Sequence, residues 1–479
     1  MGSLQCLPLA LAPPAPWASD ALPFASPEQV DTELQDLLQA ASELLCTWLG
    51  TAAQRSPLPT LGLTPAVAPL AHGLGGSALL ADLQQVMEGA YNPNHPGALA
   101  HLDPPPLPAS IVAELVCAGL NNNLLAEELS PSLTRLERSL CAWMAEAIGL
   151  PPGSGGVPAS GGTLSNLTAL VVARQQRGLQ GCAEAVVLAS DDAHVSLAKA
   201  LMVMGLPPTA LRSLPVDARG RMRTDALADQ LETSLRQGRP VLAVVATAGT
   251  TVFGAVDPLE PMAALCRRYG VWLHVDGAIG GVYALDPSHA ARVSGLGHAD
   301  SVTVNPQKLL GITKTSSLLL LAQPQLLGEV FATGLPYMET SWGGRHGGEC
   351  GLQGTRPAEI LKLWLGLRQL GQNGIRAVLD GAIERTARLQ SLLQSVPGLT
   401  VRGGDLHLLA MTANGLSPHE ADVWSQATRQ QLLSAQLMLS RPLVQGRHHL
   451  KAVLGNPHTR PEQLDQLAAI VAASLPGKP

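Results

Sequence analysis

Short runs of valine, leucine and alanine alternate with helix-like segments through the middle of the chain, and this alternation constrains the fold more than any other feature. Helices are expected between several of the runs, around Thr163–Gln176 and Glu260–Tyr269. Strands that are apolar along their whole length are buried on both faces. The pattern therefore predicts an α/β fold with a mostly parallel central sheet that helices cover on both sides. The expected strands are Ala185–Leu188, Val241–Ala246, Val271–Val275, Ser301–Val304 and Ser317–Leu321.

Two flanking regions complete the expected organisation of the 479-residue chain: an N-terminal arm (1–90), a large domain (91–355) and a smaller C-terminal α+β domain (356–479). The arm holds one amphipathic helix, roughly Glu28–Leu49, after a proline-rich start. One helix cannot bury its own apolar stripe, so we expect this helix to dock on another surface, such as a second subunit.

The C-terminal domain is expected to mix helices with short strands. A helix from about Ala358 to Leu370 is broken by the Gly-Gln-Asn-Gly run at 371–374, and a second helix continues to about Val396. The segments that follow are the strands Leu399–Val401 and Leu406–Met411 and a helix from Pro461 to about Ser474.

Composition narrows the classes of partner. A net charge of −6 argues against a nucleic-acid partner held by phosphate contacts. Only 14% of residues are charged, which indicates that part of the surface is covered in a subunit interface. The seven scattered cysteines form no CxxC pair, as expected for free thiols in a reducing compartment, and no apolar stretch reaches the roughly 18 residues of a membrane span. We therefore expect a cytoplasmic protein with no metal site and no nucleic-acid or membrane partner.

A glycine-rich segment, Gly155–Asn166, opens the helix expected at Thr163. Glycines let the backbone approach an anion closely, and the N–H groups at a helix start add donors and a positive dipole. The segment is neither a Walker A loop nor a GxGxxG fingerprint. It is compatible both with a phosphate cradle and with a turn that merely begins a helix.

Three side chains lie at or beyond predicted strand ends, where open α/β sheets bind their ligands. A carboxylate at Asp276 can hold a cationic ring nitrogen, a metal or a ribose hydroxyl, or simply cap the next helix. Lys308 lies between an apolar strand and a Leu-Leu-Gly turn, where burial can lower the pKa of its amine and free it as a nucleophile, although most lysines are solvated. His194 follows a strand, where structural histidines are more common than catalytic ones.

Together these features match what pyridoxal phosphate requires of one α/β domain. The phosphate would lie on the glycine turn and the helix start. Asp276 would keep the pyridine nitrogen protonated, Lys308 would form the Schiff base, and His194 would lie flat on the ring. The combination therefore predicts this cofactor, which no single feature does.

Eight motifs extend the pattern along most of the chain: HPGALAHL (95–102), SGGTLSN (160–166), DAHVS (192–196), ATAGTT (246–251), LHVDGA (273–278), NPQK (305–308), GTR (354–356) and LKLW (361–364). With these motifs in this order, the chain from about Asn92 to Leu475 resembles the group II pyridoxal-phosphate-dependent amino-acid decarboxylases, which include glutamate, aromatic-amino-acid and 2,4-diaminobutyrate decarboxylases. The resemblance implies a fold-type I, aspartate aminotransferase-like homodimer with active sites at the subunit interface.

The resemblance also implies roles for residues at matching positions. Lys308 would carry the cofactor, Asp276 would hold the pyridine nitrogen and His194 would stack on the ring. The other implied cofactor contacts are Gly162, Thr163 and Asn305 at the phosphate, Gln307 beside it in place of the family's usual histidine, Ala278 on the opposite face of the ring, and Thr251 beside the ring and the substrate.

The implied reaction releases CO2 from an amino acid and leaves an amine. Many family members place a tyrosine on the loop before the Gly-Thr-Arg motif to protonate Cα, but residues 338–353 contain none, and His346 is the substitute on offer. Without prompt protonation, an oxygen-dependent amine-to-aldehyde outcome is open. Another lyase reaction, an aminotransferase reaction on the same fold and a non-catalytic scaffold are the remaining alternatives.

The substrate is suggested by the segment Ala98–Asp103, which lines the substrate side in the family. It carries no aromatic ring here, which disfavours an aromatic substrate. The His101–Leu102 pair and the SGGTLSN turn look most like the diaminobutyrate decarboxylase branch. Asp103 can pair with a distal ammonium or cap a turn before Pro104. We therefore expect a small polar L-amino acid, 2,4-diaminobutyrate ahead of glutamate or aspartate, with His101 and Asp103 at its side chain.

Overall fold

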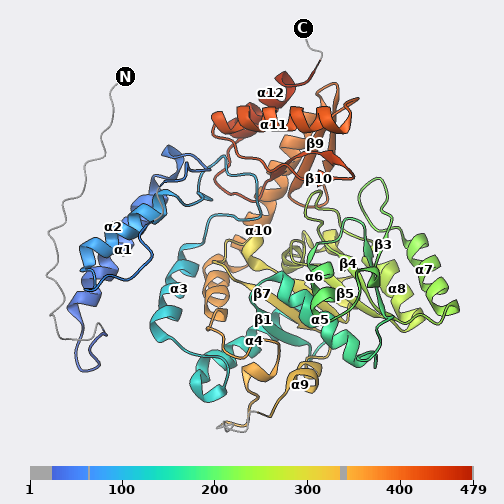
Figure 1. The fold of residues 1–479 in the computed structure, drawn as a ribbon, viewed down its shortest axis with the longest axis horizontal. Helices are drawn as coiled ribbons and strands as arrows, with labels where there is room; N and C mark the ends of the chain where they lie inside the picture. Colours follow the sequence, from blue (N-terminus) through green and yellow to red (C-terminus); the bar gives the residue numbers. More distant parts are fainter. Residues whose placement is uncertain (1–23, 63–64, 335–341, 477–479) are drawn as a thin grey trace. The chain divides into compact units, whose positions relative to one another are not determined.

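The computed structural model describes residues 24–62, 65–334 and 342–476, and the chain divides into two units, Met1–Ala98 and Leu99–Pro479. The larger unit contains a seven-stranded sheet in the order β1-β7-β6-β5-β4-β2-β3 (Figure 1). The strands β3, β2, β4, β5 and β6 pair in parallel. At the other edge β7 pairs antiparallel with β6, and β1 pairs antiparallel with β7. The predicted mostly parallel sheet is confirmed. Its strands are β1 Gly155–Ala159, β2 Val186–Ser190, β3 Leu211–Leu214, β4 Val241–Thr247, β5 Trp272–Gly277, β6 Ser301–Val304 and β7 Ser317–Leu321.

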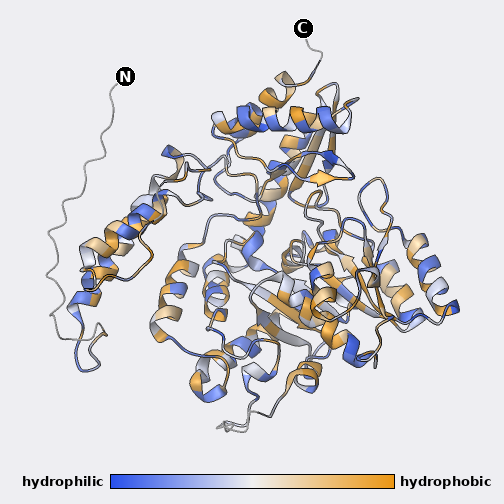
Figure 2. Cartoon of the chain, viewed as in Figure 1, coloured by the Kyte–Doolittle hydropathy of each residue, from blue (hydrophilic) through white to orange (hydrophobic). Residues whose placement is uncertain are grey.

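Alternate residues of the strands supply two cores, one on each face of the sheet. In β2, Val186 and Leu188 belong to the core with α4, α7 and α8, whereas Val187 and Ala189 belong to the core with α5, α6 and α9. Figure 2 shows that these helices carry hydrophilic as well as hydrophobic residues. The sheet is therefore covered on both sides, as its apolar strands require. The helices are α3 Pro108–Leu120, α4 Pro131–Ala147, α5 Gly162–Gln176, α6 Ser196–Val203, α7 Thr224–Arg236, α8 Leu259–Tyr269 and α9 Gln325–Phe331.

The strand β1 differs from the sequence prediction, which placed Gly155–Ala159 in a glycine-rich turn. Glycine and proline weaken strands, so the sequence carries no strand signal here. Pro158 is tolerated because β1 is an edge strand, and Gly156 is needed because a Cβ atom there would lie 2.0 Å from the Leu319 carbonyl oxygen. Only the part from Ser160 onward forms the turn before α5.

The C-terminal part combines a three-stranded antiparallel sheet, in the order β12-β9-β8, with three helices and a two-stranded β10–β11 hairpin. The predicted break is confirmed at Gly371, whose φ of 59° interrupts α10. The strand β12 was not predicted from the sequence. The elements are α10 Ile360–Gln394, β8 Leu399–Gly403, β9 Leu408–Ala413, α11 Pro418–Ser434, β10 Leu443–Val444, β11 Arg447–His448, β12 Leu450–Val453 and α12 Pro461–Ala473.

The described residues of the N-terminal unit contain two α-helices, α1 Thr32–Gly50 and α2 Gly76–Glu88, where the sequence predicted only the first. The Asp31 side chain caps α1 by accepting from the Leu34 N–H. Neither helix fully buries any residue, so docking of this arm on a second subunit stays a prediction, as do the domain boundaries. Among the described residues, no helix has both the length and the apolar character that a membrane crossing needs.

The close approach at Gly156 gives a test of the edge-strand assignment. Gly156→Ala should lower the free energy of unfolding by about 3 kcal/mol, because the methyl group collides with the backbone of β7. Gly181→Ala is the matched control, since nothing lies within 4 Å of its Cβ position, and it should change stability by less than about 0.5 kcal/mol. Urea unfolding measures both, and equal stabilities would contradict the assignment.

Candidate active site

The predicted site residues converge at the carboxyl ends of β4, β5 and β6. In the parallel register, Asp276 of β5 lies between Thr247 of β4 and Thr303 of β6. Lys308 ends the short 3-10 turn Pro306–Lys308 that follows β6. The helix α5 starts beside them, after β1. The topology thus brings the carboxylate, the lysine and the glycine turn to one edge of the sheet.

Asp276 is held by a side chain that the sequence analysis did not single out. Asn166, in the first turns of α5, donates from Nδ2 to Asp276 Oδ2 at 2.8 Å and to Ser196 Oγ at 2.9 Å. The Ala278 N–H donates to the other carboxylate oxygen at 3.2 Å. Asp276 is 7% exposed, so these bonds hold a buried carboxylate in place.

The side-chain oxygen of Asn166 also has two hydrogen-bond partners. Its Oδ1 accepts from Thr303 Oγ1 at 2.7 Å and lies 3.0 Å from His274 Nε2. Burial lowers the pKa of His274 to about 4, so its ring is neutral at physiological pH. Because Nε2 must then carry the proton to donate to Asn166, Nδ1 accepts from the Ser301 hydroxyl at 2.9 Å. One amide side chain therefore connects α5 to α6, β5 and β6 through four hydrogen bonds.

His194 reaches the same network through Ser196, whose N–H donates to His194 Nδ1 at 3.2 Å. Burial lowers the pKa of His194, and the nearby Asp276 opposes the shift only in part. The imidazole is therefore neutral near pH 7. A half-buried, neutral ring whose Nδ1 is engaged offers a flat face for an aromatic ligand.

Lys308 is the partly buried amine next to Asp276. Burial lowers the pKa of the Lys308 amine, while Asp276 and Asp103 counteract the shift. Within the described residues, Lys308 Nζ makes no hydrogen bond or ion pair. An amine with a lowered pKa and no competing partner is suited to act as a nucleophile.

The start of α5 has the features of a phosphate site. Gly161 precedes it with a φ of 119°, a conformation that favours glycine, and no side chain caps the helix. The N–H groups of Gly162 and Thr163 bond to no group in the described part of the chain. Asn305 Nδ2 points at this turn, since a Cβ atom on Gly162 would lie 3.0 Å from it. Asn305 Oδ1 is occupied by the Ser317 hydroxyl at 2.6 Å, which orients the amide. The cradle therefore fits a phosphate group.

Thr247 is a candidate contact that the sequence analysis missed. Its hydroxyl is buried and without a partner among the described residues, directly beside Asp276 in the register. Buried hydroxyls without a partner are rare, and one at a ligand-binding edge is suited to bind a ligand. The signal available in the sequence was its place at the end of the strand Val241–Thr247.

Three other predicted residues lie around this edge. Gln307 Oε1 accepts from the Ser316 N–H at 2.5 Å, which leaves its Nε2 as a donor. Ala278 is buried beside Asp276. The Thr251 carbonyl oxygen accepts from Lys451 Nζ at 3.4 Å.

Lys451 is the second candidate that the sequence analysis missed, because it lies in β12, far along the chain. It is 6% exposed. Burial and the neighbouring Lys308 lower its pKa to about 8, against the opposing effect of Asp103. A buried ammonium with one long hydrogen bond lacks a counter-charge. A carboxylate bound between Lys308 and Lys451 would supply it.

His101 and Asp103 lie beside this pair of lysines. Burial, Lys451 and other nearby cations lower the pKa of His101, and Asp103 opposes them. Asp103 forms an ion pair with Lys314 at 2.5 Å. The Asp103 carboxylate, which the sequence suggested as the partner of a substrate ammonium, is therefore already paired with Lys314.

His346 lies elsewhere. It is buried, and its Nδ1 accepts from the Glu127 N–H at 3.2 Å, close to α4. No contact within the described ranges joins His346 to Lys308 or Asp276. In this chain His346 is held in a structural position, so nothing supports it as the group that protonates Cα.

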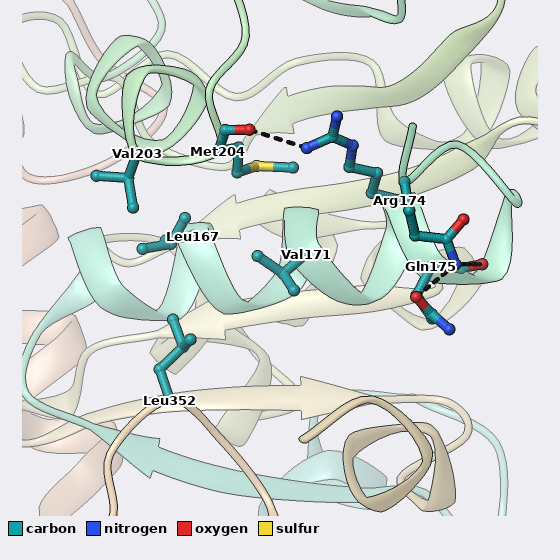
Figure 3. A pocket seen from close by; sticks show the side chains of 8 residues that line it. Leu167, Val171, Arg174, Gln175, Val203, Met204 and Leu352 are labelled. Carbon is teal, nitrogen blue, oxygen red and sulfur yellow. Dashed lines mark hydrogen bonds between the residues drawn. The ribbon is translucent and has the colours of Figure 1, made fainter. Parts of the chain in front are cut away.

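A surface cavity of about 330 Å³ lies on the outer side of α5, away from these groups (Figure 3). Its one cationic side chain, Arg174, is turned to backbone carbonyls, including that of Met204 at 2.9 Å. No predicted site residue lines this cavity. Its lining residues are Leu167, Val171, Arg174, Gln175, Gln180, Val203, Met204 and Leu352.

The family model of the pyridoxal-dependent decarboxylase conserved domain matches residues 77–399. The chain belongs to this family. It is 32% identical over 424 residues to an L-2,4-diaminobutyrate decarboxylase of Rhizobium meliloti, covering 85% of this chain and 83% of the relative. It is 30% identical over 339 residues to an L-aspartate decarboxylase of Metarhizium robertsii, covering 68% and 67%.

Solved structures agree with the fold. A glutamate decarboxylase domain from Vibrio parahaemolyticus, part of a diaminobutyrate–pyruvate transaminase and L-2,4-diaminobutyrate decarboxylase, superposes with a TM-score of 0.80 at 23% identity, covering 94% of this chain and 97% of that one. Oryza sativa TDC with PLP and tryptamine gives a TM-score of 0.87 at 20% identity, covering 94% and 99%. The protein is thus a fold-type I, pyridoxal-phosphate-dependent carboxy-lyase of the group II decarboxylase family.

The network around Asn166 predicts a coupled loss of stability and cofactor affinity. Asn166→Ala leaves the buried Asp276, His274 and Thr303 short of partners and should lower the free energy of unfolding by about 2–4 kcal/mol. It should also weaken pyridoxal phosphate binding, because Asp276 is no longer oriented. Asn122→Ala is the control, since within the described ranges its side chain bonds only to the nearby Leu120 carbonyl. Neither urea unfolding nor a cofactor titration should change for it. Unaltered cofactor affinity in Asn166→Ala would refute the role.

Lys451 predicts a pH dependence. With a pKa near 8, its ammonium form falls from roughly nine-tenths at pH 7 to one-tenth at pH 9, so a carboxylate held by that charge binds less well as the pH rises. Lys451→Arg keeps the charge at all these pH values. The value of kcat/KM should therefore fall above about pH 8 in the natural enzyme and at higher pH in the variant. Coincident alkaline limbs would rule out Lys451 as the titrating group.

Proposed function

We propose that this enzyme decarboxylates a small polar L-amino acid to the corresponding amine and CO2. The observation that carries the proposal is the pairing at one sheet edge of a buried, oriented carboxylate, Asp276, with an unpaired amine of lowered pKa, Lys308. Asp276 would hold the pyridine nitrogen of a cofactor ring bound between them, and Lys308 would bind its aldehyde.

In the proposed arrangement Lys308 holds the cofactor through its amine and Asp276 keeps a proton on the pyridine nitrogen. The phosphate is bound by Gly162, Thr163 and Asn305, with Gln307 beside it. When bound there, pyridoxal phosphate supplies a conjugated, electron-accepting ring for the pair of electrons left as CO2 departs.

The other residues orient the ring and the substrate. His194 would cover one face of a bound ring and Ala278 the other, which would keep water from the reacting centre. Thr247 adds a hydroxyl donor at the ring edge, and Thr251 positions Lys451 through its carbonyl oxygen. Lys451 would neutralise a carboxylate of the bound substrate. Lys308, a partly buried amine of lowered pKa at the same edge, would be a group able to hand a proton to Cα.

For the substrate, the proposal includes 2,4-diaminobutyrate, glutamate and aspartate. The relatives named above act on diaminobutyrate and on aspartate, which supports a short polar side chain but does not choose between a cation and an anion. The sequence ranked diaminobutyrate first because the His101–Leu102 pair and the SGGTLSN turn look like that branch, and because Asp103 can pair with a distal ammonium. The ion pair between Asp103 and Lys314 removes the second reason and leaves the first.

We also propose that the enzyme works as a homodimer in the cytoplasm. Support for the dimer comes from α3, which exposes four apolar side chains of a kind that usually mark protein contacts: Val112, Leu115, Val116 and Leu120. Support for a reducing compartment comes from the six cysteines among the described residues, all of them free thiols.

The decisive experiment replaces the amine. Lys308→Ala should abolish CO2 release from every amino acid tested, and Lys308→Arg should do the same, because a positive charge without a nucleophilic amine cannot substitute. Borohydride treatment of the natural holoenzyme should fix the cofactor on Lys308, as detected by peptide mass. Undiminished CO2 release from folded Lys308→Ala would refute the proposal, and a requirement for a keto acid would indicate an aminotransferase instead.

A further inference from the structure

The segment that carries His101 and Asp103 is fixed against the C-terminal sheet. The Leu99 N–H donates to the Met438 carbonyl at 3.0 Å, and the Val453 N–H donates to the Leu99 carbonyl at 2.7 Å. Val453 lies two residues beyond Lys451 in β12. These two bonds place the segment alongside Lys451, so His101 and Asp103 share the mouth of the site with Lys451 and Lys308.

Cations predominate at this mouth. Lys451 is buried, and the Thr251 carbonyl is its one hydrogen-bond acceptor among the residues that the structure describes. Lys314 is half-exposed and pairs with Asp103. Arg429, on α11, is a third cation close enough to His101 to act on its pKa. Asp103 is the carboxylate that opposes these positive charges. Asp276 does not face them, since its carboxylate oxygens are bonded to Asn166 and to the Ala278 N–H.

A substrate brings one α-carboxylate, which balances one of these cations. A distal ammonium would then enter a region where Asp103 must be shared with Lys314 and where the remaining charges repel it. A distal carboxylate would instead meet uncompensated positive charge. Like-charge juxtaposition is the usual means by which a site rejects a wrong partner.

We infer that the substrate carries a second carboxylate on its side chain, as aspartate or glutamate does, and that Lys314 is a residue that selects it. The inference rests on the proposed decarboxylase function and narrows it to acidic amino acids. In this arrangement Asp103 holds the Lys314 ammonium at the mouth, and the ammonium then faces the substrate's distal carboxylate.

The position of Lys314 is suited to this role. Its carbonyl oxygen accepts from the fully buried Lys362 Nζ at 3.1 Å, so the backbone is held independently of the side chain. A substitution of the half-exposed Lys314 side chain therefore leaves this bond in place. The neighbouring Thr315 hydroxyl donates to Glu359 at 2.5 Å, which holds the same loop at a second point.

The first measurement compares substrates on the natural holoenzyme. CO2 release should give kcat/KM values for aspartate or glutamate at least about tenfold above that for 2,4-diaminobutyrate. A preference for diaminobutyrate would overturn the inference and leave the decarboxylase function intact. Absence of CO2 from every amino acid would overturn the function itself, and the inference with it.

The second measurement reverses one charge. Lys314→Glu should lower kcat/KM for the acidic substrate by about tenfold to a hundredfold and should lower that for diaminobutyrate much less or raise it. Lys314→Met should lie between. Asp465→Asn, which removes the half-exposed ion pair with Arg388 on the C-terminal domain, is the control and should change neither value.

Folding is monitored separately by thermal melting and by the absorbance of the bound cofactor. A folded, cofactor-loaded Lys314→Glu enzyme that loses activity equally on both substrates would overturn the selecting role of Lys314. A fall in the ratio of kcat/KM for the acidic substrate to kcat/KM for diaminobutyrate in Lys314→Glu would support it.

Discussion

The hydrogen bond between Asn166 and Asp276 is the interaction on which the site depends. A carboxylate that is 7% exposed is costly to bury unless its oxygens are bonded. Asn166 supplies one of those bonds at 2.8 Å. Its three other hydrogen-bonding positions are bonded to Ser196, His274 and Thr303. Because Asn166 belongs to the helix whose first turn forms the phosphate cradle, the same residue ties the two ends of the cofactor site together.

The fold and the first layer of the site could be predicted because their signals are local. Strands buried on both faces are continuous apolar runs, and the ends of those runs placed Asp276 and Lys308 at one edge of a parallel sheet. The edge strand β1 could not be predicted, because Gly156 and Pro158 suppress the strand signal and only its partner β7 explains them. Its glycine is required by a backbone 163 residues away in sequence, as the Leu319 contact shows.

The missed site residues share another cause. Asn166 lies inside a recognised motif but acts by completing a polar network, and the value of a network is visible only when all its members are placed. Thr247 is an ordinary strand residue until its hydroxyl is found buried without a partner. Lys451 comes from a strand near the end of the chain, and the Thr251 carbonyl that it reaches lies in the loop after β4. Distance along the sequence hides such residues from any local pattern.

Substrate choice follows from the same long-range assembly. A carboxylate at position 103, taken alone, favours a cationic substrate, and so does the likeness of the His101–Leu102 pair to the diaminobutyrate branch. Its pairing with Lys314, and the nearby Lys451 of β12, add positive charge that the motif itself does not reveal. The proposed preference for an acidic substrate therefore rests on the summed charge of residues that come from distant parts of the chain, which no local motif can reveal.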